Sequence, residues 1–123
     1  MSRARYEPFP DPGSQTPIGF EVEVPPHHQG VIAHVDELRR HAQVQHVWVA
    51  LWTAAGAHTL HSPVAVEVLG PDGSAWPCGH LSDADSPGWR RLLELRFQDG
   101  VRWIWPAVII EPDPDAWRLV FYH

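Results

Sequence analysis

The chain has 123 residues, one cysteine and a formal charge of −6 with its histidines neutral. This length suits one domain with its own hydrophobic core, and a single cysteine excludes an internal disulfide and favours a cytoplasmic location. Because the basic residues of this acidic chain are scattered and no apolar run approaches the length of a membrane span, we expect neither a nucleic-acid partner nor a membrane partner.

Residues 1–17 are predicted to form a disordered or loosely packed tail, and residues 18–123 a single β domain. The tail contains four prolines together with glycine, serine and aspartate. Such a segment cannot bury enough apolar surface to offset the conformational entropy that is lost on ordering. We therefore expect removal of residues 1–15 to leave the stability of the domain unchanged.

A strand and a helix are predicted next. Apolar and polar side chains alternate from Ile18 to Val24, which is typical of a strand with one exposed face, and two prolines end it. From Val31 to Ala42 the apolar side chains recur at helical spacing, and Asp36 and Arg40 are placed for an i,i+4 ion pair. This segment predicts one short helix.

The segment from Val44 to Thr53 predicts a strand that is apolar on both faces. Trp48 and Trp52 alternate with smaller apolar side chains that point the other way. A strand of this kind is covered on both sides. We therefore expect the helix, another subunit or a ligand to lie on the face that carries Trp48 and Trp52.

Two hairpins are predicted in the second half of the chain. The first joins Val64–Leu69 to a strand beginning at Ser74, through the turn residues Pro71-Asp72-Gly73. A polar loop over 78–88 follows it. The second covers Arg90–Ile110, with its turn at Gln98-Asp99-Gly100, where glycine supplies a positive φ.

The register of the second hairpin places its aromatic side chains in the core. Counting from the turn, Leu93, Leu95 and Phe97 face Trp105, Trp103 and Val101 on one side of the ribbon. Pro106 cannot donate to a ladder, so we expect its strand to be an edge or to carry a bulge. An exposed edge beside Trp103 and Trp105 would accept a partner strand.

The count of predicted strands sets the fold class. A last strand, Trp117–Tyr122, brings the total to about seven. The fold is predicted to be mainly β, a sandwich or partly open small barrel of about seven antiparallel strands with one short helix.

Four residues form a candidate metal site: His58, His61, Cys78 and His80. A thiolate with imidazoles suits zinc. Their spacing matches no well-known zinc module, however, and the chain has nine histidines. We therefore expect no cofactor, with zinc at these residues as the alternative. No nucleophile elbow or phosphate-binding glycine loop is present, so we identify no catalytic residue and favour a protein that is not an enzyme.

The tryptophans carry the functional hypothesis. The chain has seven of them, and exposed tryptophan is common in protein interfaces and in sugar-binding platforms. We expect a non-catalytic interaction module that binds a protein partner, or a second copy of itself, through Trp48, Trp52, Trp103 and Trp105. The alternatives are a small molecule or carbohydrate held between surface tryptophans, and a metal-dependent enzyme that uses the histidine and cysteine ligands.

Overall fold

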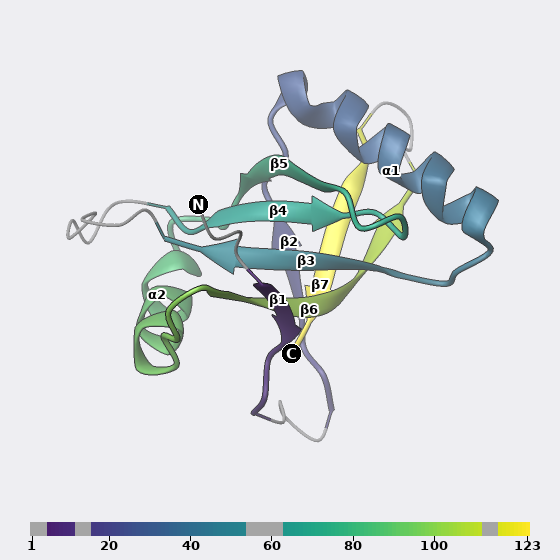
Figure 1. The fold of residues 1–123 in the computed structure, drawn as a ribbon. Coiled ribbons are helices and arrows are strands. Elements are labelled where there is room, and N and C mark those ends of the chain that lie inside the picture. Colours follow the sequence, from purple (N-terminus) through teal and green to yellow (C-terminus); the bar gives the residue numbers. More distant parts are fainter. Residues whose placement is uncertain (1–4, 12–15, 54–62, 112–115) are drawn as a thin grey trace.

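The computed structural model describes residues 5–11, 16–53, 63–111 and 116–123. These residues form seven strands, two α-helices and a short 3-10 helix (Figure 1). In chain order the elements are β1 (Arg5–Pro8), β2 (Gly19–Val22), η1 (Pro26–His28), α1 (Gln29–Ala42), β3 (Val47–Trp52), β4 (Ala65–Leu69), β5 (Ala75–His80), α2 (Ser86–Leu95), β6 (Val101–Ile110) and β7 (Arg118–Tyr122).

The strands form one curled sheet in the order β2-β7-β6-β3-β4-β5, with β1 beside β6. A bridge between Glu23 and His80 joins the two ends of this order, through backbone hydrogen bonds of 2.8 and 3.1 Å. The pairings along the order are antiparallel, whereas β1 runs parallel to β6. A mainly β, partly open barrel is therefore confirmed, with one parallel strand added to it.

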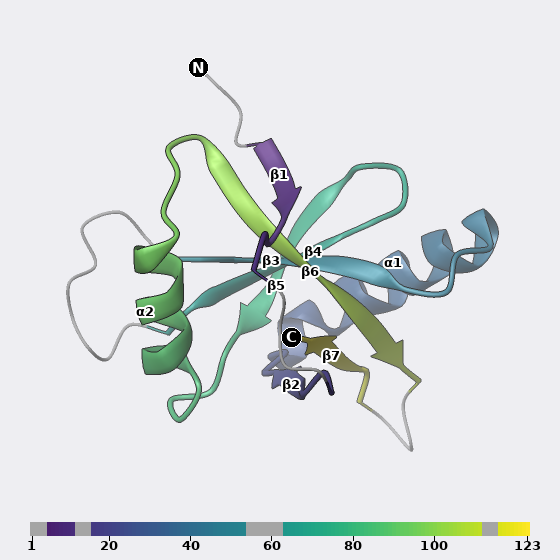
Figure 2. The ribbon, with the colours of Figure 1, turned by 90° about the horizontal axis from the view of Figure 1, so that it is seen from below.

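The two α-helices lie toward opposite ends of β3 and β4 (Figures 1 and 2). Helix α1 covers the predicted helical segment, and the Asp36–Arg40 ion pair forms at 2.9 Å. Its residues Ile32 and Val35 are fully buried. Of the stripe that predicts this helix, Val35 is fully buried, Val31 and Leu38 are half-buried and Ala42 is exposed, so the buried face of α1 is centred on Ile32 and Val35.

The second helix, α2, overturns the hairpin predicted over Arg90–Ile110. Residues 86–95 are helical, and only the second half of that segment, β6, is a strand. Pro87 suits the first turn of a helix, and the spacing of Trp89 and Leu93 puts both on its buried face. Trp89 inserts its ring against Phe20, Trp105 and Phe121. The packing of Trp89 against these rings therefore decides that the segment is helical, and the alternation of apolar and polar residues in its sequence does not.

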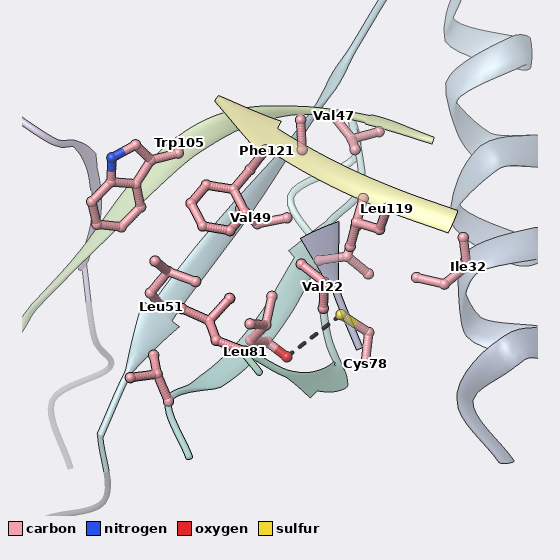
Figure 3. Close-up of a cluster of buried hydrophobic side chains, with 14 of the residues drawn as sticks. Val22, Ile32, Val47, Val49, Leu51, Cys78, Leu81, Trp105, Leu119 and Phe121 are labelled. Atoms are coloured by element: carbon pink, nitrogen blue, oxygen red, sulfur yellow. Dashed lines mark hydrogen bonds between the residues drawn. The ribbon is translucent and has the colours of Figure 1, made fainter. Parts of the chain in front are cut away.

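The core lies inside the curl of the sheet and draws on almost every element. Figure 3 shows the side chains of β2, β3, β5, β6 and β7 converging, with Ile32 of α1 beside them. The polar loop predicted over 78–88 is wrong at its start, because β5 continues to His80 and buries Cys78 completely. The core residues with an exposed fraction of 2 % or less include Ile32, Val49, Leu51, Val66, Cys78, Leu81, Trp105, Leu119 and Phe121.

Pro106 lies inside the sheet without interrupting it. On one edge of β6, the pairing with β1 ends at Ile104 and the pairing with β7 begins at Ala107. The backbone of Ile104 accepts a bond from Phe9 on that edge, and alternate residues of a strand direct their N–H groups to the same edge. The missing N–H of Pro106 therefore falls in the gap between β1 and β7.

The N-terminal segment is not left outside the core. Arg5–Pro8 form β1 on the edge of β6 that we expected to be open to a partner strand. Phe9 stacks on Trp105 with ring centres 4.9 Å apart, and it packs edge-on against Trp103 at 5.9 Å. Composition could not reveal this contact, because it depends on one aromatic side chain, and the strand that precedes it pairs through its backbone.

We expect Phe9→Ala to lower the free energy of unfolding by about 1–3 kcal/mol. This loss is smaller than that for a fully buried phenylalanine, because the Phe9 ring is half-buried. Phe97→Ala is the matched control, since that ring is 76 % exposed and its removal should change stability by less than about 0.5 kcal/mol. Urea unfolding of both variants measures the difference. Equal stabilities would mean that the N-terminal segment adds nothing to the fold.

Candidate functional site

An open pocket lies at the end of the sheet where β3 and β6 separate. Their pairing ends at Ala50 and Ile104, and beyond that point β6 pairs with β1. The pocket has a volume of about 670 Å³. Its walls come from the end of β3, the end of α2 and the start of β6, and they include Leu51, Trp52, Leu93, Phe97, Arg102 and Trp103.

Of the two charged side chains that line the pocket, Glu94 is exposed and Arg102 is neutralised within the protein. The guanidinium carbon of Arg102 lies 4.7 Å from the centre of the Trp52 ring, and the same guanidinium pairs with Glu67, whose side chain is only 10 % exposed. The Tyr6 hydroxyl donates to the same carboxylate at 3.4 Å. Partial burial, and then the negative charge of Glu67, hold the pKa of Tyr6 above its ordinary value. The pocket therefore suits an apolar occupant that leaves Arg102 paired with Glu67.

Two apolar side chains at and after the end of α2 are left in solvent. Leu95 is 73 % exposed at the end of α2, and Phe97, which lines the pocket, is 76 % exposed. Both were expected to face the core of a hairpin. Leu95 is exposed because it lies on a different side of α2 from the buried Leu93. Phe97 lies between the helix and β6, where it extends the apolar wall of the pocket into solvent.

The four tryptophans singled out from the sequence divide between two places. Trp52 and Trp103 line the large pocket. Trp48 and Trp105 line a smaller hollow of about 280 Å³, next to Phe9 and His123. Trp105 is a core residue at 2 % exposure, whereas the other three are half-buried. Sequence reasoning missed Phe97 as a pocket residue, because the expected strand turned it inward.

Trp103 is fixed at the pocket wall by its indole nitrogen. Its Nε1–H donates to the backbone oxygen of Arg96 at 2.9 Å. Arg96 follows α2 directly, and its side chain forms two hydrogen bonds of 2.6 and 2.5 Å to Asp11. The pocket wall is therefore attached both to the end of α2 and to the N-terminal segment.

The candidate metal site is only partly described. His58 and His61 lie outside the described residues. Cys78 is fully buried and its thiol donates to the Val66 oxygen at 3.5 Å, while the His80 ring lies 3.5 Å from the Glu23 carboxylate. In the described segments, no three histidine, cysteine, aspartate or glutamate side chains form a group that could hold a metal ion.

Cys78 gives a prediction for alkaline solution. Burial raises the pKa of its thiol from 9.0 to about 12, so the folded state holds the proton more tightly than the unfolded state. The thiol's contribution to stability is complete below pH 9 and is lost as the pH rises toward 12. Urea unfolding across this range should show a steeper fall for the wild type than for Cys78→Ala. Parallel pH profiles would contradict the raised pKa.

Comparisons with known proteins do not identify the class to which this protein belongs. No family model, no curated protein and no solved structure matches the chain. Among the helices that the structure describes, none has both the length and the apolar character to cross a membrane. The function must therefore be inferred from the geometry of the pocket.

Proposed function

We propose that this chain is a non-catalytic binding module that receives an apolar side chain of a protein partner in the pocket between β3, α2 and β6. The observation that carries the proposal is the exposure of Phe97 on the wall of a pocket that Trp52 and Trp103 also line. Large apolar side chains left in solvent next to a hollow are typical of surfaces that another protein covers.

The chemistry of the pocket supports this kind of partner. Protein interfaces concentrate their binding energy in a few aromatic residues at a pocket, surrounded by groups that exclude water. Here the aromatic walls are Trp52, Trp103 and Phe97, and the guanidinium of Arg102 is paired with the carboxylate of Glu67. An inserted leucine, methionine or phenylalanine side chain would bury apolar surface without separating Arg102 from Glu67.

A small apolar molecule is the second candidate occupant. The pocket volume of about 670 Å³ lies within the usual range for small-molecule sites. A carbohydrate would need an open indole face, and the guanidinium of Arg102 lies over one face of Trp52. The geometry therefore favours an apolar molecule over a sugar within this alternative.

Selection from a random peptide library on the immobilised full chain tests the proposal. Peptides that bind through the pocket should share an aromatic or long aliphatic anchor and should lose at least about tenfold in affinity on Phe97→Ser. This variant should keep the melting temperature of the wild type, because the ring is 76 % exposed. Isothermal titration with the selected peptides gives both affinities.

Trp76→Ser is the matched control for the selection. Trp76 is also exposed, but it lies on β5 beside His34, away from the residues that line the pocket. Peptides should bind this variant as they bind the wild type. Selected peptides that bind Phe97→Ser with unchanged affinity would overturn the proposal, and so would a selection that yields no binder. Pocket-dependent binding of small apolar fragments alone would favour the second candidate.

We also propose a cytoplasmic location, which the presence of only one cysteine in the chain supports.

A further inference from the structure

The wall of the apolar pocket carries one carboxylate without a partner in the described part of the chain. Glu94 lines the pocket and is exposed. Among the described residues, no ion pair includes Glu94. The other charged residue of the wall, Arg102, is paired with Glu67. The pocket therefore presents a single uncompensated negative charge next to its aromatic side chains.

The place of Glu94 in α2 adds to this negative charge. The helix covers Ser86–Leu95, so Glu94 lies in its last turn, and that turn contains no basic residue. The carbonyl groups at the C-terminus of a helix carry a partial negative charge, which stabilises nearby cations. Leu93 and Phe97, on either side of Glu94, also line the pocket, and Figure 2 shows this end of α2 leading into β6. The end of α2 therefore favours a positive group at this side of the pocket.

The nearby arginines do not compensate this charge. Arg96 follows the helix directly, but its guanidinium is bound to the carboxylate of Asp11. Arg91 lies one turn before Glu94 and is exposed, and it is not among the described residues that line the pocket. Asp99 adds a second exposed carboxylate in the turn before β6, and the whole chain has a formal charge of −6. A basic segment is therefore attracted to this protein at long range as well as at the pocket.

We propose that the partner segment bound at this pocket carries a lysine or arginine beside its apolar anchor, and that this cation pairs with Glu94 at the end of α2. The proposal rests on the proposed function, because the same pocket receives the anchor. It adds the charge of the partner. A segment with an acidic residue in the same place would meet both Glu94 and the negative end of the helix, and would be rejected.

The two side chains of the partner must lie on one face of its segment. Side chains share a face when they are two residues apart in an extended chain, or three to four residues apart in a helix. We therefore expect the basic residue of a bound segment within four residues of its apolar anchor, on either side.

Selection from three peptide libraries on the immobilised full chain is the first experiment. All three libraries contain apolar and uncharged polar residues at random. The first also contains lysine and arginine, the second aspartate and glutamate, and the third no charged residue. Peptides whose binding is lost on Phe97→Ser should come from the first library at least about tenfold more often than from the second. Equal recovery of such peptides from these two libraries would overturn the inference.

A double-mutant cycle then tests whether the basic residue of a selected peptide pairs with Glu94. Glutamine replaces the basic residue of the peptide, and Glu94→Gln removes the carboxylate of the protein. Each change alone should weaken binding about threefold, and the second change should add little once the first is made. Isothermal titration gives the four affinities, and added salt should reduce the coupling. Losses that multiply, as for two independent groups, would contradict the ion pair.

Glu37→Gln is the matched control for Glu94→Gln. Glu37 is also an exposed carboxylate on a helix, but it belongs to α1, which lies toward the opposite end of β3 and β4 (Figure 1). This variant loses the same charge and should bind the selected peptides as the wild type does. A threefold loss here as well would mean that only the net charge of the protein matters, and the inference would be wrong.

Glu94→Lys tests the sign of the charge. Lysine is favourable in the last turn of a helix, so this variant should keep the melting temperature of the wild type. It should reverse the selection, so that pocket-dependent binders come from the library with aspartate and glutamate. An unchanged preference for basic peptides would overturn the inference.

Failure of the proposed function has a different signature in the same measurements. Basic peptides that bind Phe97→Ser as tightly as the wild type do not use the pocket, and they would overturn the proposed function together with this inference. Peptides that require Phe97 but bind Glu94→Gln and Glu94→Lys with unchanged affinity would overturn the inference alone.

Discussion

Trp105→Ala should lower the free energy of unfolding by about 3–5 kcal/mol and the melting temperature by more than about 10 °C. Trp105 is 2 % exposed and contacts rings from three other parts of the chain: Phe9, Trp89 and Phe121. Its removal would open a large cavity where the N-terminal segment, α2 and β7 meet. Urea unfolding followed by far-ultraviolet circular dichroism measures the loss.

Trp76→Ala is the control for Trp105→Ala, because it removes the same side chain from a partly exposed position. Trp76 is 37 % exposed, and its indole donates to the Ser74 hydroxyl at the end of a hairpin. Its loss should cost less than about 1 kcal/mol. A Trp105→Ala protein that is as stable as this control would show that the aromatic cluster is not the centre of the fold.

Gly79→Ala should destabilise the protein by about 3 kcal/mol or more. A Cβ atom at this position would lie 2.1 Å from the backbone oxygen of Glu23, a distance that backbone atoms cannot accommodate without moving. The strand would have to shift, and the two hydrogen bonds that join Glu23 and His80 would be lost. Chemical denaturation gives the stability, and amide exchange at His80 reports on the bridge.

Gly30→Ala is the control for Gly79→Ala. Gly30 lies in the first turn of α1, and a Cβ there would meet nothing within 4 Å. Alanine is the better helix former, so this change should leave stability unchanged or raise it by up to about 1 kcal/mol. If Gly79→Ala behaved in the same way, the close approach that joins β2 to β5 would not be a requirement of the fold.

Local signals predicted those elements whose environment follows from their own residues. The stripe of Val31–Ala42 is helical, and the turn at Pro71-Asp72-Gly73 joins β4 to β5 with Gly73 at φ 87°. Gly100 also has the expected positive φ of 76°. These predictions succeeded because side-chain periodicity and the freedom of glycine act within a few residues.

The candidate site was predictable only in part. Trp52 and Trp103 were singled out from composition, and both line the pocket. Phe97 was placed on the wrong surface, because Leu93, Leu95 and Phe97 alternate like a strand although the first two belong to a helix. Short apolar runs satisfy both periodicities, and packing of distant residues then chooses between them.

By itself the sequence determined a mainly β domain with one helix over Val31–Ala42 and turns at Gly73 and Gly100. The tertiary structure alone decided that Ser86–Leu95 is helical, since Trp89 finds its aromatic partners only when β2, β6 and β7 are assembled. It also decided that Phe9 belongs to the fold, because the rings that hold it come from the other end of the chain. Contacts between residues so far apart leave no periodic trace in a single sequence, since their stabilisation depends on proximity in space.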